Sequence, residues 1–170
     1  MRGSILGGTR VLVRVLMVLN IIVGIAFFGI FLATLQVDGA LLMRLSAKYG
    51  VSANAITTFL RFMLVTGVLA AGVAHVFLRA LRQILASVAM GDPFIAENGR
   101  RLRRMGFAML AFQIGDLILG YIDVSLDGLG ADTVNWLPSI GGWLAVLLLF
   151  VLARVFAVGA AMRDELEGTV

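Results

Sequence analysis

Four long apolar runs divide the chain. The first, from Val15 to Val37, contains no charged residue over 23 positions. At ~1.5 Å per helical residue, such a run exceeds the ~30 Å hydrocarbon core of a bilayer. The other runs cover residues 62–78, 105–122 and 133–153, and only Asp116 places a charge inside one of them. This pattern predicts membrane-crossing helices at about 11–37, 54–90, 93–126 and 136–164.

The second predicted helix is longer than a bilayer requires. Its 37 positions, from Asn54 to Met90, correspond to ~55 Å of helix. Beyond the apolar run it continues as an amphipathic helix, with apolar residues spaced i, i+3, i+4 and i+7 at Leu81, Ile84, Leu85 and Val88. We therefore expect it to leave the membrane and to form one arm of a helical hairpin over about residues 79–104.

The turn of this hairpin has the composition of a helix-to-helix connection. Gly91 is a typical residue at which a helix ends, Asp92 can cap the next helix, and Pro93 suits a first helical position. Phe94 is expected to fold back onto Leu85 or Val88. The sequence therefore predicts that the third helix begins directly at the proline.

A basic cluster follows the turn. Asn98 and Gly99 are expected to interrupt or fray the start of the third helix. Beyond them, four arginines surround Leu102: Arg100, Arg101, Arg103 and Arg104. The cluster has two interpretations, a solvated turn that faces lipid head groups and a cytoplasmic docking hairpin for a protein partner. The chain's own acidic tail, with Asp164, Glu165 and Glu167, is a candidate to cover these arginines.

Composition supports an integral membrane protein. Hydrophobic residues make up 61% of the chain, charged residues 14%, and the mean hydropathy is +1.02. The expected fold class is all-α, a four-helix membrane bundle in one domain, with spans at about 11–37, 57–79, 104–126 and 136–158. A cleaved signal peptide is the alternative for the first run, although its apolar stretch would be shorter. The absence of cysteine excludes disulfides and thiol chemistry.

The distribution of basic residues predicts the orientation. Three basic residues, Arg44, Lys48 and Arg61, lie in or beside the other two loops. The termini and the hairpin hold eleven: Arg2, Arg10, Arg14, Arg79, Arg82, Arg100, Arg101, Arg103, Arg104, Arg154 and Arg163. The positive-inside rule then places both termini and the hairpin in the cytoplasm, as in a multi-pass protein of the inner membrane. The net charge of +4 requires no nucleic acid, because anionic lipid head groups supply the counter-charge.

Two segments resemble a known family. The hairpin carries the pattern GxPF-x-x-x-N-x-x-x-L at Gly91, Pro93, Phe94, Asn98 and Leu102. A second segment near the end of the chain carries a VF-x-x-G-x-x-L-like pattern at Val155, Phe156 and Gly159, with Met162 in place of leucine. Together these segments, the hairpin motif and the C-terminal motif, resemble the bacterial membrane family of unknown function DUF2975.

The resemblance implies a regulatory context rather than a reaction. Genes of this family frequently lie beside a gene for a small helix-turn-helix regulator, which implies a cytoplasmic protein partner. The family often ends in a DLTV-like tail, whereas this chain ends in LEGTV, so a recognition role of that tail is not carried over.

Residues that carry enzyme chemistry are missing from the sequence. It has one histidine and none of the short motifs of zinc hydrolases, serine esterases, P-loop proteins or dinucleotide-binding proteins. We expect no enzyme activity, no cofactor and no metal. The polar residues inside the spans are Asn20, His75, Gln113 and Asp116, and interhelical hydrogen bonds are expected of Asn20 and Gln113.

Asp116 is the most unusual of these positions. A carboxylate near mid-depth costs ~2.5–3.5 kcal/mol, so Asp116 is expected to face other helices, with Asn20, Gln113 or His75 as neighbours. Two function classes remain. The first is a non-enzymatic regulatory or adaptor protein that binds a cytoplasmic partner, and the alternative is a small ion- or proton-coupled transporter or channel that uses Asp116. The sequence does not indicate an oligomeric state.

Overall fold

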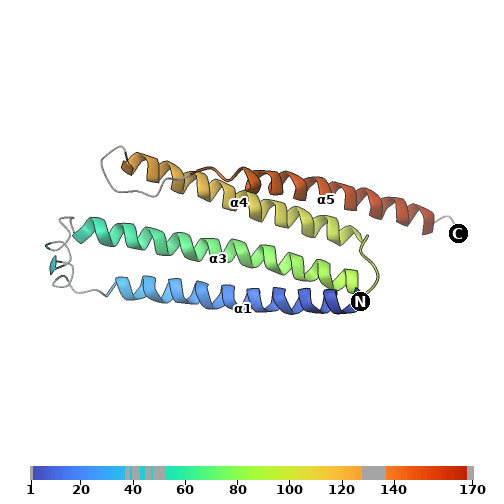
Figure 1. The fold of residues 1–170 in the computed structure, drawn as a ribbon, viewed down its shortest axis with the longest axis horizontal. Helices are drawn as coiled ribbons and strands as arrows, with labels where there is room; N and C mark the ends of the chain where they lie inside the picture. The colour runs from blue at the N-terminus through green and yellow to red at the C-terminus, as the bar shows by residue number, and fades with distance from the viewer. Residues whose placement is uncertain are drawn as a thin grey trace. The chain divides into compact units, whose positions relative to one another are not determined.

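The computed structural model describes residues 2–36, 39, 43, 44, 47, 53–127 and 137–167, and all regular secondary structure in these residues is helical. The main helices in this part of the chain are labelled in Figure 1 and are α1 (Arg2–Thr34), α3 (Ala53–Ala89), α4 (Ala96–Asp127) and α5 (Ile140–Glu167). All four are long and apolar enough to cross a membrane. The predicted all-α class and the four spanning helices are therefore confirmed.

The helix bounds differ from the predicted ones mainly at the starts. Helix α1 begins at Arg2, nine residues before the predicted residue 11. Within this added segment, the side chain of Arg10 donates a 3.4 Å hydrogen bond to the Leu85 carbonyl. Helix α5 begins at Ile140, after Pro138 rather than around it. Ser139 caps this helix, since its hydroxyl accepts a 3.2 Å hydrogen bond from the Gly142 amide. The predicted end at 37 and start at 136 lie outside the described residues.

Tertiary contacts divide the chain into two compact units. The larger unit contains residues 1–14 and 76–170, and the smaller unit contains residues 15–75. The C-terminal part of α3 therefore belongs with α4 and α5, and its N-terminal part belongs with most of α1. The expected single domain remains a prediction.

The smaller unit pairs α1 with α3 through small residues and two interhelical hydrogen bonds. A Cβ added at Gly24 would lie 3.2 Å from Cβ of Ala71, so the helices approach closely at this point. The amide of Asn20 donates a 2.9 Å hydrogen bond to the Ala71 carbonyl, which is the interhelical bond expected of this residue. Arg61 donates a 2.7 Å hydrogen bond to the carbonyl of Thr34, and this cation stabilises the C-terminal end of α1.

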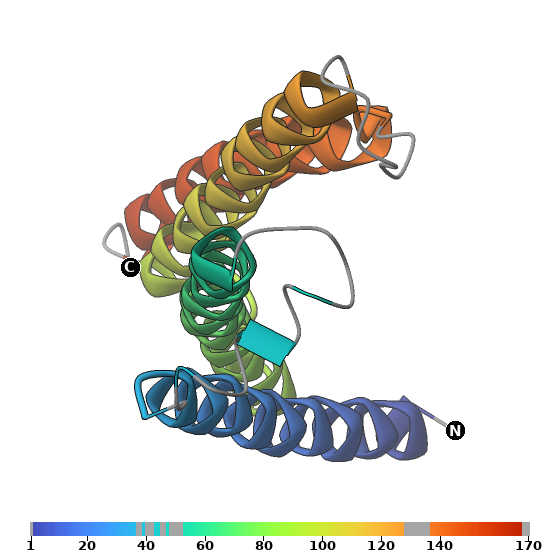
Figure 2. The same ribbon diagram turned by 90° about the vertical axis from the view of Figure 1, so that its left-hand side faces the viewer.

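The larger unit is built around α4 and α5, which run antiparallel and side by side in both ribbon views (Figures 1 and 2). Its buried core contains Ala80 of α3, Leu102 and Met105 of α4, and Ala153 of α5. Aromatic and aliphatic side chains pack around these four residues: Phe77, Leu81, Ile84, Leu149, Leu152 and Phe156. Leu102, a residue of the hairpin motif, is thus a core residue.

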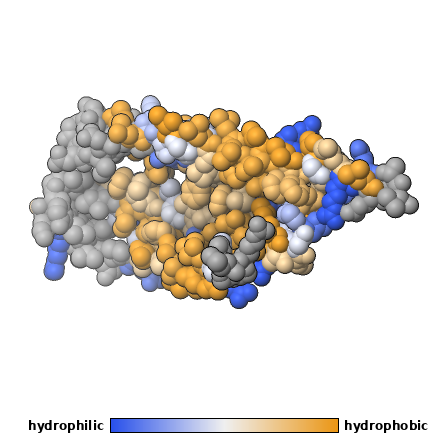
Figure 3. Space-filling model, turned by 45° about the vertical axis from the view of Figure 1, so that its right-hand side comes forward, coloured by the Kyte–Doolittle hydropathy of each residue, from blue (hydrophilic) through white to orange (hydrophobic). Residues whose placement is uncertain are grey.

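Apolar side chains cover most of the outside of the helices. Hydrophobic residues dominate the face drawn in Figure 3, and Ile25, Leu69 and Leu147 are among the large apolar side chains that are exposed. Such a surface is unfavourable in water and is the expected one in lipid. The chain is therefore a multi-pass membrane protein.

The turn between α3 and α4 begins as predicted but ends differently. Gly91 has a φ of 85°, and its amide donates to the Val88 carbonyl at 3.2 Å. The next amide, of Asp92, donates to the Ser87 carbonyl at 3.2 Å, which completes a Schellman motif. However, residues 92–95 are not helical and α4 begins at Ala96. The prediction that Asp92 caps α4 and that Pro93 opens it was wrong.

Candidate functional site

The hairpin motif and the C-terminal motif meet in the larger unit. The ring of Phe94 stacks on the ring of Phe156, with centroids 5.1 Å apart and an interplanar angle of 28°. Gly159, one helical turn further along α5, leaves space for the same ring, because a Cβ added there would lie 3.3 Å from Cδ1 of Phe94. The ring contact of Phe94 is therefore with α5, a partner that the prediction of packing on Leu85 or Val88 did not include.

Asn98 is the centre of a buried hydrogen-bond network. Its side chain is 0% exposed, and its amide nitrogen donates to the Ser87 hydroxyl at 2.6 Å and to the Pro93 carbonyl at 2.8 Å. Its amide oxygen accepts a 2.7 Å hydrogen bond from Arg101. The Ser87 hydroxyl in turn donates to the Ile84 carbonyl at 2.8 Å. This network fastens the end of α3 to the turn and to the first turns of α4.

The predicted break at Asn98 and Gly99 does not occur. Both residues are buried within α4, which continues from Ala96 without interruption. Asparagine disfavours helices because its side chain competes for backbone groups. Here the side chain bonds outside its own helix, to Ser87 and to the turn, so the helix is kept.

A third link joins the turn to α5. Asp92 forms an ion pair with Arg163, and both side chains are partly exposed. An exposed pair of this kind contributes ~0–1 kcal/mol, so it orients the two segments more than it stabilises them. Two acids of the tail, Asp164 and Glu165, are exposed, and the side chain of Glu167 and residues 168–170 lie outside the described residues. Covering of the arginines by this tail stays a prediction.

The four arginines of the hairpin have different roles. Arg101 is half-buried and donates to Asn98 and, at 3.4 Å, to the Gln83 carbonyl, so it is a structural residue of the network. Arg100 forms an exposed ion pair with Glu97 one turn earlier. Arg103 and Arg104 are exposed and make no hydrogen bond or ion pair with any described residue. Arg101 is therefore held within the network, and the availability of these arginines to a partner stays a prediction.

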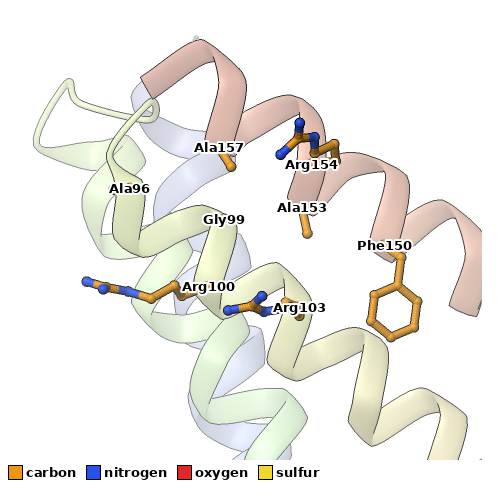
Figure 4. Close-up of a pocket in the computed structure, with 8 residues that line it drawn as sticks. All are labelled: Ala96, Gly99, Arg100, Arg103, Phe150, Ala153, Arg154 and Ala157. Atoms are coloured by element: carbon orange, nitrogen blue, oxygen red, sulfur yellow. The ribbon is translucent and has the colours of Figure 1, made fainter. Parts of the chain in front are cut away.

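A groove of about 230 Å³ lies between α4 and α5 (Figure 4). Its floor is small and apolar, because Ala153 and Ala157 project from α5 toward α4. Three arginines line the groove, Arg100 and Arg103 from α4 and Arg154 from α5, and the side chain of Arg100 points away from α5 (Figure 4). The groove is lined by Ala96, Gly99, Arg100, Arg103, Phe150, Ala153, Arg154 and Ala157.

The polar residues of the spans are shared between the two units. Gln113, in the larger unit, is buried and donates a 3.2 Å hydrogen bond to the carbonyl of Ser139, just before α5. Asp116, one turn further along α4, is half-buried. In the smaller unit, Asn20 bonds to α3 as described, and His75 is half-buried and makes no hydrogen bond to a described residue. The neighbours predicted for Asp116 stay a prediction.

Sequence reasoning missed three contributors to this site. Ser87 is 2% exposed and bonds to Asn98, yet in the sequence it is an ordinary small residue of an apolar stripe. Arg154 and Arg163 were counted only as charges, although one lines the groove and the other pairs with Asp92. A polar residue on the buried face of the helical wheel would have been the signal for Ser87.

No group of three or more His, Asp or Glu residues that could hold a metal ion occurs within the described ranges. Among known proteins, residues 44–170 match the family described as "Protein of unknown function (DUF2975)". This match includes the hairpin motif and the C-terminal motif. Neither the curated proteins nor the solved structures contain a match to the chain.

Proposed function

Because the chain belongs to the DUF2975 family, we propose that it is a non-enzymatic membrane protein that docks a cytoplasmic regulatory protein. The hairpin motif and the C-terminal motif meet where Phe94 stacks on Phe156, and we call this meeting point the junction. The observation that carries this proposal is the buried Asn98 network, together with the stacking of Phe94 on Phe156. The bacterial inner membrane and cytoplasmic termini are parts of the same proposal, and they rest on the distribution of basic residues.

The network supports docking because a connecting turn does not need it. A loop that only returns the chain to the bilayer can satisfy its polar groups with water. Here an asparagine, a serine and an arginine are fully or partly withdrawn from solvent to fix the turn. A surface that is ordered before binding loses less conformational entropy when a partner binds, which favours recognition.

The residues presented by the junction indicate the chemistry of the partner. Met90, at the turn, is 79% exposed, and Met162 and Leu166 on α5 are also exposed. Arg104 adds positive charge that no described residue neutralises. These features suit a protein surface that combines an apolar pocket with acidic residues. A small helix-turn-helix regulator, which the family resemblance implies, is the partner that we propose.

Site-specific photo-crosslinking tests this function. A photoreactive phenylalanine analogue is placed at Met90 in the full chain, in cells that express the neighbouring regulator. Leu137 is the matched control, because it is 83% exposed but precedes α5 at the other end of the helix from the junction. We expect an adduct with the helix-turn-helix protein from position 90 and none from position 137. Lipid adducts alone at position 90, or the same protein adduct from both positions, would contradict the proposal.

A further inference from the structure

The groove between α4 and α5 combines a cationic rim with an apolar floor. On α4 its residues follow the spacing i, i+3, i+4 and i+7, at Ala96, Gly99, Arg100 and Arg103. On α5 they follow the same spacing, at Phe150, Ala153, Arg154 and Ala157. Each set is one stripe of its helix, so the groove is the open edge of the seam between the two helices (Figure 4).

Glycine and alanine bring the two backbones close under the arginines. A Cβ added at Gly99 would lie 3.2 Å from the Ala153 carbonyl oxygen and 3.3 Å from the Ala157 nitrogen. Because Ala153 and Ala157 are small, the floor of the groove lies close to the helix backbone, while the longer side chains of Arg103 and Arg154 lie at its rim. An elongated ligand can therefore lie along the seam with its charged end among the guanidinium groups.

The charge of the rim is not compensated. Arg103 and Arg154 make no hydrogen bond or ion pair with any residue in the described part of the chain, and only Arg100 has an acidic partner, Glu97. Guanidinium groups bind phosphate oxygens in bidentate geometry. The groove thus carries two arginines without an acidic partner among the described residues, one on each helix, whose guanidinium groups are suited to phosphate.

The next turns of the seam toward the spans are apolar. Phe107 is one turn beyond Arg103 on α4, and its ring meets Phe150 edge to face with centroids 5.1 Å apart. Leu147 is one turn beyond Phe150 on α5, and both Phe107 and Leu147 are exposed. A ligand that follows this path needs a phosphate at one end and hydrocarbon at the other, which an acidic peptide does not provide.

We propose that this groove is a specific site for an anionic phospholipid, with its phosphate between Arg103 and Arg154 and an acyl chain along Phe150, Phe107 and Leu147. Basic pockets between helices at the end of a span bind anionic head groups in this manner. The site differs from the general attraction of the basic residues to the membrane surface, because it requires these arginines and not others. It does not depend on the proposed protein partner, whose crosslinking test uses no groove residue.

Native mass spectrometry of the full chain tests the site. The purified protein is equilibrated in detergent with equal amounts of phosphatidylglycerol and phosphatidylcholine, and the retained lipid is counted. We expect preferential retention of phosphatidylglycerol and a loss of about tenfold or more in the double variant R103Q/R154Q, because it removes two charge-assisted contacts to the phosphate. The matched control R79Q/R104Q removes the same charge from exposed positions that do not line the groove, and should change retention by less than about twofold.

A second variant changes the shape of the groove without changing its charge. Ala157 is exposed, so Ala157→Phe can fill the groove while α5 stays folded, which circular dichroism and gel filtration would verify. We expect this variant to lose phosphatidylglycerol as well. Equal losses in the two double variants, or full retention in Ala157→Phe or in R103Q/R154Q, would overturn the site. Equal retention of both lipids, with binding of a glutamate-rich peptide that R103Q/R154Q abolishes, would assign the groove to a protein segment instead.

Discussion

The side-chain amide of Asn98 donates a 2.6 Å hydrogen bond to the hydroxyl of Ser87, eleven residues earlier in the chain. Both side chains are withdrawn from solvent, at 0% and 2% exposure. Each side chain also bonds to a backbone carbonyl, Ser87 to that of Ile84 and Asn98 to that of Pro93, so removing one of the pair leaves the other buried with one hydrogen bond fewer. The bond therefore fixes the distance between the end of α3 and the start of α4, and with it the geometry of the junction.

We expect Asn98→Leu to lower the free energy of unfolding by ~2–3 kcal/mol, since the Pro93 carbonyl loses its hydrogen bond and Arg101 keeps only the longer one to the Gln83 carbonyl. Ser87→Ala should cost ~1 kcal/mol, and the double variant should cost clearly less than the sum of the two. These free energies are measured by unfolding in detergent micelles. Gln36→Leu is the control, because it replaces an amide by leucine at an exposed position. Additive costs would show that the two side chains do not stabilise each other.

The stacking of Phe94 on Phe156 predicts a second coupling. Phe94→Ala and Phe156→Ala should each destabilise the protein, and their double-mutant cycle should give ~0.5–1.5 kcal/mol of coupling. Phe59, an exposed phenylalanine of the smaller unit, provides the control, and it should show no coupling to Phe94. The two motifs would be independent of each other if the measured coupling were zero.

The number and type of the helices were predictable because few backbone structures can cross a bilayer. An apolar run of this length must satisfy its backbone hydrogen bonds internally, so it becomes a helix whatever its neighbours are. The end of α3 was also predictable, since the left-handed φ of Gly91 is favoured by glycine alone. These features depend on local sequence and on the solvent, and both can be read without a structure.

The start of α4 was not predictable, because distant residues decide it. Local propensity favours a cap at Asp92 and a first turn at Pro93. In the structure, Asp92 pairs with Arg163, 71 residues away, and the Pro93 carbonyl accepts from Asn98. The break predicted at Asn98 does not occur for the same reason. Its side-chain amide donates a hydrogen bond to Ser87 of another helix, so it does not compete for the backbone groups of α4.

The orientation of the chain is a separate prediction. Eleven of the fourteen basic residues lie in the termini and the hairpin, so the two other loops should be on the outer face. Reporter fusions placed after Gly39 and after Asp127 should both give the signal of the outer face, and a fusion after Arg163 should give the cytoplasmic signal. A cytoplasmic signal from either loop fusion would reverse the proposed topology, and with it the docking of a cytoplasmic protein.

Asp116 distinguishes the docking function from the transport alternative. Under the docking function, Asp116→Asn should keep the stability of the fold within ~0.5 kcal/mol, because the amide preserves size and polarity. Under the transport alternative, the same variant should abolish ion or proton flux into vesicles that contain the protein. Flux that is present in the parent chain and absent in Asp116→Asn would favour the alternative over the docking function.

Close packing of α4 on α5 makes Gly99 sensitive to substitution by alanine. Alanine normally stabilises a helix by ~0.8–1 kcal/mol relative to glycine, so a gain is expected where space is free. Gly115, on the same helix, has no heavy atom within 4 Å of an added Cβ, and Gly115→Ala should give that gain.

At Gly99 the added Cβ would meet backbone atoms of Ala153 and Ala157, which cannot move without shifting α5. Overpacking of this kind costs ~1–3 kcal/mol and should exceed the gain in helix propensity. Gly99→Ala should therefore unfold at a lower denaturant concentration than the parent, and Gly115→Ala at a higher one. Equal stability of the two variants would mean that α5 is free to move away from α4, and that the seam is not rigid.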